Sequence, residues 1–307
     1  MRNHRSPPED TATTVRPPAP LSWAVSGHQH AGRRESQQDA LRIVDLLGNG
    51  TGPTLVVVCD GMGGHSGGEV ASAVAADGFV DWVQAAVASG AFRFQGGLVE
   101  EAVEPVLREG LAAANTAIAE RLAEGGPEGM GTTLLAGLVL GRDIAWISVG
   151  DSPLWVVRRG LLLRLNADHS MGAVLDELAR QGKLTAEEAK LDRTRSALRS
   201  ALTGEDIAMV DVRVRRDWME PGDTLLFASD GVLTLDDRDI LAWARQASHP
   251  GPAAASLVDR VMAAGERHQD NVTVVCLSND WEPADRAPDE PKGLLARIAG
   301  FLRSGSS

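Results

Sequence analysis

The sequence predicts an α+β fold in which two antiparallel β-sheets pack face to face and helices cover them, an α-β-β-α sandwich. Short β-branched runs recur along the chain, for example at residues 54–59, 143–149 and 272–277. Several of these runs are joined by links too short for a crossover helix, so neighbouring strands must be antiparallel. Two long stretches of helical spacing, at residues 69–87 and 98–122, are interleaved with the strands.

The composition is that of a globular protein and excludes several functional classes. The chain has 307 residues, of which 43% are hydrophobic and 23% charged, enough for one large domain or two small ones. The net charge of -12 argues against nucleic acid as a partner and suits a site that collects divalent cations. The sequence has no tyrosine, which excludes a tyrosine nucleophile. Cys59 and Cys276 lie in apolar runs and are expected to be buried thiols, not a disulfide.

The N-terminal half begins with an arm that we expect to be disordered. Residues 1–20 are rich in proline, threonine and charge, and they lack the apolar region of a secretory signal. No stretch of about 18 uninterrupted apolar residues indicates a transmembrane segment, so we expect a cytoplasmic protein. Strands are expected from residue 21 and at residues 54–59, the second ending in a glycine-rich turn that starts at Asp60. The helix at residues 69–87 should bury its spaced valines and Phe79.

From residue 132 onward the hydrophobic period becomes strand-like. Four strands joined by tight turns, an antiparallel meander, are expected at residues 133–140, 143–149, 154–158 and 161–165. Residues 171–189 return to helical spacing, and the segment from Thr185 to Glu188 matches a capping box. The remaining expected elements are strands at 209–214, 224–229 and 272–277 and helices at 238–246 and 253–266.

The folded domain is expected to span residues 21–280, followed by a different segment at 281–307. This segment starts as an acidic, proline-bearing linker. From residue 291 its apolar side chains fall on one helical face: Leu294, Leu295, Ile298, Phe301 and Leu302. We expect a short amphipathic helix that docks on its own domain, on a partner or on a membrane surface, too short to span a bilayer.

Four aspartates point to the chemistry of the protein. Each lies where a strand begins or ends, beside a glycine or a small polar residue: Asp60, Asp151, Asp230 and Asp270. Converging carboxylates repel one another unless hard cations neutralise them. Two divalent ions about 3.5–4 Å apart would generate hydroxide near neutral pH and clamp phosphoryl oxygens. A single Asp-Gly pair is more often a turn, so this prediction depends on four positions sharing one context.

The order of the motifs resembles the metal-dependent protein phosphatase 2C family over about residues 21–278. Each motif is weak alone, and the full series is specific: Gly32-x-Arg34-x-x-x-Gln38-Asp39, Asp60-Gly61-Met62-Gly63-Gly64-His65, Gly131-Thr132-Thr133, Gly150-Asp151-Ser152, Asp168-His169-Ser170, Ser229-Asp230-Gly231 and Asp270-Asn271. Residues 182–189 also look like the variable flap of bacterial members. The family fold is a pair of antiparallel sheets flanked by helices, in agreement with the strand pattern.

The resemblance implies a protein serine/threonine phosphatase whose catalytic domain is residues 21–280. Phosphoserine and phosphothreonine would be hydrolysed by a water activated at a dinuclear Mn²⁺ or Mg²⁺ centre, with two tight ions and a third, weaker one. The implied metal ligands are Asp39, Asp60, Gly61, Asp151, Asp230 and Asp270. The implied catalytic residues are Asp60 and Arg34, the latter gripping the substrate phosphate as a planar bidentate donor.

The resemblance assigns each ligand a separate role. Asp60 would bridge the two tight ions, and the carbonyl of Gly61 would complete one of them. Asp230 and Asp270 would bind the first ion, and Asp39 would hold metal-bound water. The third ion would lie between Asp230 and Asp151.

Three positions depart from the family pattern. Gln38 stands where many members carry Glu, which removes one negative charge near the ions. Met62 stands where eukaryotic members carry a histidine proposed as the general acid, so a metal-bound water is the expected proton donor. Pro153 stands where Arg is frequent, and no function is assigned to it.

Two interpretations from different classes follow. The first is an active phosphatase that acts on a phosphorylated protein and opposes a serine/threonine kinase. The second is a catalytically silent module that binds a phosphoprotein or senses metal. Degenerate members usually lose a metal aspartate, and this chain keeps all of them, which favours the enzyme. A stress-response phosphatase acting on a phosphorylated anti-sigma-factor antagonist shares the chemistry and differs only in substrate.

Overall fold

The structure is a computed structural model that describes residues 21–50, 52–64, 67–94, 96–246 and 252–279. The N-terminal arm and the amphipathic C-terminal segment expected from the sequence lie outside these residues.

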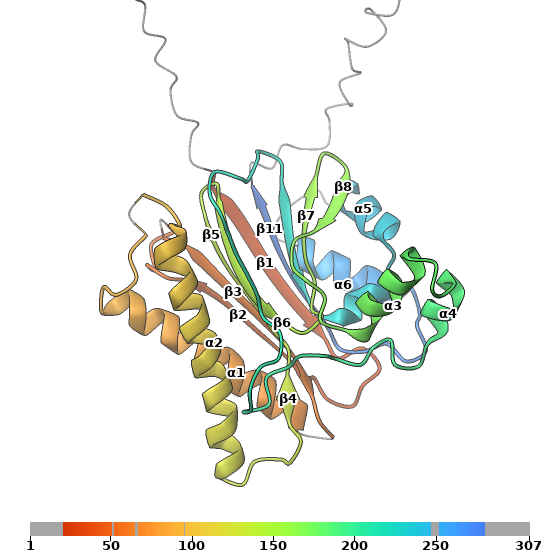
Figure 1. The fold of residues 1–307 in the computed structure, drawn as a ribbon. Coiled ribbons are helices and arrows are strands. Elements are labelled where there is room, and N and C mark those ends of the chain that lie inside the picture. Colours follow the sequence, from red (N-terminus) through yellow and green to blue (C-terminus); the bar gives the residue numbers. More distant parts are fainter. Residues whose placement is uncertain (1–20, 51, 65–66, 95, 247–251, 280–307) are drawn as a thin grey trace, which may run out of the picture.

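Two antiparallel sheets form the centre of the molecule (Figure 1). The six-stranded sheet contains, in spatial order, β2 (Asp39–Asp45), β3 (Thr54–Met62), β5 (Leu134–Leu140), β6 (Asp143–Val149) and β9 (Asp211–Arg215), with β4 (Gly131–Thr132) paired to the end of β3. The five-stranded sheet contains β1 (Trp23–His30), β11 (Val272–Asn279), β10 (Thr224–Ala228), β7 (Leu154–Arg158) and β8 (Leu161–Arg164).

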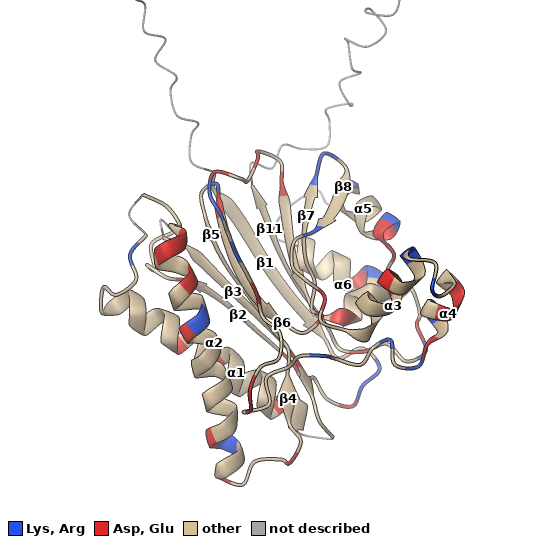
Figure 2. Ribbon diagram, in the orientation of Figure 1, with Lys and Arg blue, Asp and Glu red and all other residues tan. Residues whose placement is uncertain are grey.

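Helices cover both outer faces of the two sheets. α1 (Gly67–Ala88) and α2 (Glu100–Ala123) lie over the six-stranded sheet, while α5 (Asp237–Gln246) and α6 (Ala253–Ala263) lie over the five-stranded one. α3 (Met171–Arg180) and α4 (Ala186–Leu191) form a pair beside the sandwich, and the 3-10 helix η1 (Asp230–Thr234) follows β10. In Figure 2 the charged residues gather on the helices and on the surrounding loops.

Three apolar layers hold this arrangement together. One lies between α1, α2 and the six-stranded sheet, one between the two sheets, and one between the five-stranded sheet and α5 and α6. Cys59 and Cys276 are both buried and free, as predicted. The predicted α-β-β-α sandwich is therefore confirmed.

Two local predictions were wrong. The four-strand meander does not form, because β5 and β6 belong to one sheet while β7 and β8 belong to the other. The link between β6 and β7 crosses between the sheets, and it turns at Gly150, whose φ of +102° suits glycine. The second strand also does not end before Asp60: β3 continues to Met62 because Gly61 and Met62 pair with β4.

α1 is long and apolar enough to cross a membrane by length and composition. In this structure it is a core helix, packed on α2 and β3, and Ala71, Ala75 and Phe79 are fully buried along its inner face. Its apolar composition is therefore explained by burial against protein.

Candidate metal centre

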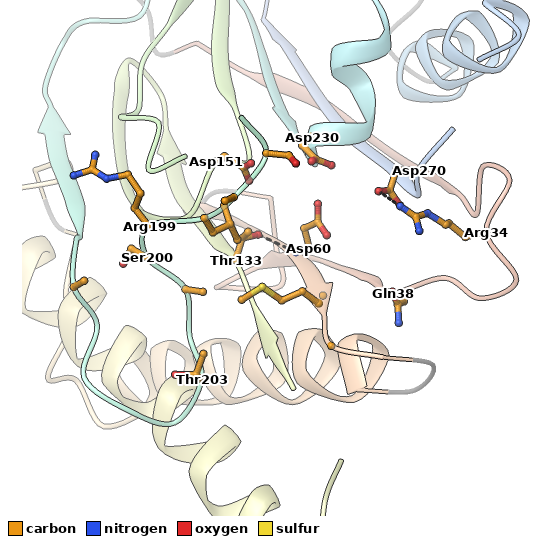
Figure 3. Close-up of a pocket in the computed structure, with 18 of the residues that line it drawn as sticks. Arg34, Gln38, Asp60, Thr133, Asp151, Arg199, Ser200, Thr203, Asp230 and Asp270 are labelled. Atoms are coloured by element: carbon orange, nitrogen blue, oxygen red, sulfur yellow. Dashed lines mark hydrogen bonds and ion pairs between the residues drawn. The ribbon is translucent and has the colours of Figure 1, made fainter. Parts of the chain in front are cut away.

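A pocket of about 750 Å³ opens where loops from both sheets meet, and acidic side chains line it. Asp60, Asp151, Asp230 and Asp270 all face this pocket, as does Arg34 (Figure 3). They come from five separate segments of the chain, so the fold itself brings them together. The structure thus gathers the four aspartates that the sequence singled out.

Asp60 is fixed by its backbone. Its N–H donates to Thr133 Oγ1 at 3.0 Å, and its carbonyl accepts from the Thr133 N–H at 2.8 Å and from Thr132 Oγ1 at 2.9 Å. Thr133 Oγ1 also lies 2.9 Å from Ser152 Oγ in the loop that carries Asp151. One buried hydroxyl pair therefore connects the backbone segments that carry two of the four aspartates.

Gly61 lines the pocket at a point where two backbones cross. A Cβ at Gly61 would lie 2.1 Å from the carbonyl oxygen of Gly68 in α1, and a Cβ at Gly68 would lie 2.7 Å from Gly61. The Gly61 N–H donates to the Gln38 carbonyl at 3.1 Å. Glycine is required here because two chains come into backbone contact beside the pocket.

Asp270 and Arg34 form an ion pair of 2.7 Å at the pocket mouth, where both side chains are largely exposed. Asn271 fixes the surrounding loop: its Oδ1 accepts from the Gln38 N–H at 2.7 Å, and its Nδ2 donates to the carbonyls of Ala31 and Ser36. The loop that carries Arg34 is therefore attached to the start of β11. The pairing of Arg34 with a predicted metal ligand was not foreseen.

Asp39 lies behind the pocket and does not line it. Its Oδ2 accepts from Ser229 Oγ at 2.7 Å and from Thr273 Oγ1 at 2.6 Å, while its buried Oδ1 has no hydrogen-bond partner within the described residues. Burial raises the pKa of Asp39 to about 6, partly offset by these two hydroxyls. A buried carboxylate oxygen without a partner is costly unless a donor or a cation reaches it.

The pKa values of the pocket carboxylates are raised by burial first and by one another second. Burial and the charge of Asp230 raise the pKa of Asp151 to about 7. Burial, followed by the charges of Asp39 and Asp230, holds the pKa of Asp60 well above its usual range. The pKa of Asp230 is also raised by burial, although its hydrogen bond with Asp60 opposes the rise. If all of these carboxyls were ionised, the cluster would carry more negative charge than one arginine neutralises.

This donor set fits hard divalent cations. Carboxylate oxygens and a backbone carbonyl are the ligands that Mg²⁺ and Mn²⁺ prefer, and a cation would offset the repulsion that raises these pKa values. As the side chains stand, no three His, Cys, Asp or Glu groups among the described residues converge tightly enough to enclose one ion. Asp270 is turned toward Arg34 in this arrangement. The chemistry of the donors supports a metal centre.

One wall of the pocket was missed by the sequence analysis. Residues between Ser196 and Ala208, among them Arg199 and Thr203, line the side opposite Arg34. The segment is attached to the sandwich by the bridges Ser170–Leu198 and Thr132–Leu202. The sequence of this segment carries no metal-ligand spacing. Only its position directly after α3 and α4 could have marked it as part of the pocket.

A family model described as Protein phosphatase 2C matches residues 26–275. The serine/threonine protein phosphatase PstP of Mycobacterium tuberculosis is 33% identical over 226 residues, which are 73% of this chain and 40% of that protein. The serine/threonine phosphatase stp of Listeria monocytogenes is 31% identical over 234 residues, 74% of this chain and 84% of that protein.

The solved structures agree with these relatives. The catalytic domain of PstP in complex with two manganese ions superposes with a TM-score of 0.61 at 30% identity, covering 84% of this chain and 99% of that one. This chain therefore corresponds to less than half of the full Mycobacterium protein and to nearly all of its solved catalytic domain.

Proposed function

Because this chain belongs to the protein phosphatase 2C family, we propose that it is a metal-dependent protein serine/threonine phosphatase. The observation that carries the proposal is the pocket in which Asp60, Asp151, Asp230 and Asp270 meet beside Arg34. The chain keeps every metal aspartate of the family motifs, although Gln38 replaces a frequent Glu, and this favours an enzyme over a silent phosphoprotein-binding module. The manganese ions bound by PstP support the same chemistry here.

Two tight ions would be held by Asp60, Asp230, Asp270 and the carbonyl of Gly61, with Asp39 behind them. A third, weaker ion would use Asp151 and Asp230. When bound, Mn²⁺ or Mg²⁺ supplies Lewis acidity, which makes water acidic enough to attack phosphorus near neutral pH. The unpartnered Oδ1 of Asp39 would accept a hydrogen bond from a water held by these ions.

Arg34 would bind the substrate phosphate. Its guanidinium is held at the mouth of the pocket by Asp270 and is more than half exposed, so a phosphate can reach its remaining donors. The planar fork would orient the phosphoryl group toward the carboxylate cluster. Met62 lines the pocket and has no proton to donate, so the leaving serine or threonine oxygen would take its proton from water.

The substrate would be a phosphorylated protein, and the enzyme would oppose a serine/threonine kinase. A phosphorylated anti-sigma-factor antagonist remains one form of that substrate. A cytoplasmic location and docking through the segment at 281–307 stay part of the proposal.

The test is Mn²⁺ titration by calorimetry together with hydrolysis of a phosphothreonine peptide, with and without EDTA. Asp60→Asn should nearly abolish turnover and disrupt the tight sites, because it removes charge shared by both ions. Asp151→Ala should keep the two tight ions, while lowering kcat or raising the Mn²⁺ concentration that activity needs.

Asp143→Asn is the matched control. Asp143 is buried and lies outside the pocket, where its carboxylate accepts from the N–H groups of Leu98 and Asp217 at 2.7 Å. Asp143→Asn should lower the free energy of unfolding and leave Mn²⁺ binding unchanged. Near-wild-type turnover in Asp60→Asn would overturn the proposal, and metal binding without hydrolysis of any phosphopeptide would favour the silent module.

A further inference from the structure

Arg164, the last residue of β8, reaches back to the loop that carries Asp151. Its Nη2 donates to the Asp151 carbonyl at 2.7 Å, and its Nη1 donates to Asp168 Oδ2 at 2.9 Å. Its side chain is 26% exposed and that of Asp168 is 28% exposed, so the contact is largely shielded from solvent. One guanidinium therefore connects the backbone of Asp151 to a second carboxylate.

The neighbours of Asp151 are held by uncharged groups. Asn166 donates to the Ser152 carbonyl at 2.9 Å and accepts from the Leu154 N–H at 2.8 Å. The Gly150 N–H donates to Nδ1 of the buried His169 at 3.2 Å. These contacts place the loop as a whole. Arg164 also donates to Asn166 Oδ1 at 3.4 Å, and it differs from these groups because it donates to Asp151 itself and brings a positive charge close to that carboxylate.

Asp168 extends this contact to the start of α3. Its second oxygen accepts from the Ser170 N–H at 2.9 Å, and Ser170 is the N-cap of α3. Ser170 also bridges to Leu198 in the pocket wall. A continuous series of hydrogen bonds thus runs from Asp151 through Arg164 and Asp168 to the start of α3.

We propose that Arg164 is a positioning residue that sets Asp151 for the weaker metal ion and links that ion's site to α3. The inference rests on the proposed function. Residue 153, where the family frequently has arginine, is here a buried proline without an N–H, and its carbonyl accepts from Ala228. The cation at this loop comes from β8 instead.

The test is calorimetric titration of the full chain with Mn²⁺, without substrate, in wild type and Arg164→Gln. The variant should keep both tight ions and bind the weaker ion about tenfold less tightly or worse, as is common when a residue that supports a metal ligand is lost. The Mn²⁺ concentration for half-maximal hydrolysis should rise in parallel.

Arg158→Gln is the control for simple loss of a shielded ion pair. Arg158 is 15% exposed, pairs with Asp223 at 2.6 Å and contacts no pocket residue within the described chain. The Arg158→Gln substitution should lower the thermal unfolding temperature and leave the affinities for all Mn²⁺ ions unchanged. If Arg164→Gln does not fold, Arg164→Lys replaces it and should show a smaller loss at the weaker ion only, because lysine keeps the charge and not the fork.

A folded Arg164 variant with unchanged affinity for the weaker ion would overturn the inference, as would equal weakening of all ions. A wild-type protein that binds two tight ions and no third would also overturn it, while leaving the proposed function standing. If the wild-type protein binds no Mn²⁺ tightly, the result would instead refute the proposed function.

Discussion

Among single residues, Arg34 is paired with Asp270 in the structure and would also bind the substrate phosphate under the proposed function. It is paired with Asp270 at 2.7 Å, and this partner raises its pKa further, so it stays charged at every working pH. The exposed ion pair adds little to stability. Its value is orientation, because it holds a long side chain at the pocket mouth.

Arg34→Ala should raise KM for a phosphopeptide roughly tenfold or more with a smaller effect on kcat, because a charge-assisted contact of about 1.5–3 kcal/mol is lost in ground and transition states alike. Mn²⁺ binding should be retained, since no metal ligand is removed. Steady-state kinetics and calorimetry on the same samples measure both. Arg34→Lys should be intermediate, and an unchanged KM in Arg34→Ala would contradict the assignment.

The sequence predicted which aspartates, with Arg34 and Gly61, would line the pocket, but not the contacts among them. Asp60, Asp151, Asp230 and Asp270 stand in recognisable motifs, and the structure places all four in one pocket. The Arg34–Asp270 pair could not be predicted, because the two residues are 236 positions apart and only the folded chain brings them together. The roles assigned to individual ligands stay predictions.

Among the elements, the contact between β3 and α1 depends on two glycines. Gly61 and Gly68 lie so close that a Cβ on Gly68 would be 2.7 Å from the carbonyl carbon and oxygen of Gly61 and 2.9 Å from the Met62 nitrogen. These are backbone atoms that cannot rotate away. The first turn of α1 is therefore in direct backbone contact with Gly61, which lines the pocket.

Gly68→Ala should destabilise the protein by roughly 1–3 kcal/mol through overpacking. Gly67→Ala is the matched control: it is the preceding residue of α1, and its Cβ would meet Met130 at an ordinary 3.4 Å. That variant should be neutral or slightly stabilised, because alanine favours helix over glycine. Denaturant unfolding measures both. Equal stability of the two variants would show that the crossing tolerates a methyl group.

Several element boundaries followed from the hydrophobic pattern and from capping residues. The strands at 143–149 and 154–158 and the capping box at Thr185 are confirmed. The inner face of α1 was predicted only in part. Phe79 and Val83 are fully buried as expected, but Val70 and Val74 are only half-buried. Ala71 and Ala75 are fully buried instead. Small residues turn inward because α1 lies close to both α2 and β3. A hydrophobic pattern based only on bulky side chains does not identify these small inward-facing residues.

At the scale of the whole molecule, sheet assignment was the limit of the sequence. Strand period fixes which residues share a face, but it does not say which sheet a strand joins. The change of sheet between β6 and β7 depends on tertiary packing, including the Phe227 ring that fills the space between β10 and β5. Hairpin links alone therefore predicted one meander where there are two pairs.

The spacing of the two sheets depends on a pair of residues that face each other across the central layer. A Cβ on Gly137 in β5 would lie 2.4 Å and 2.5 Å from two ring carbons of the fully buried Phe227 in β10. The ring occupies the space that glycine leaves. Gly137→Ala should therefore cost roughly 1–3 kcal/mol, because the enclosed ring must move into other core side chains.

Phe227→Leu should also destabilise the protein, since it leaves a cavity between the sheets. In the double variant the added methyl enters the space freed by the ring, so the combined loss should fall short of the sum by on the order of 1 kcal/mol. Denaturant unfolding of the wild type, the two single variants and the double variant completes this double-mutant cycle. Mn²⁺ titration of each protein checks that the pocket is intact. Additive losses, within about 0.5 kcal/mol, would mean that the sheets adjust their spacing independently of this contact. Coupling would show that the sandwich holding the aspartates in place is set by complementary volumes across its middle layer.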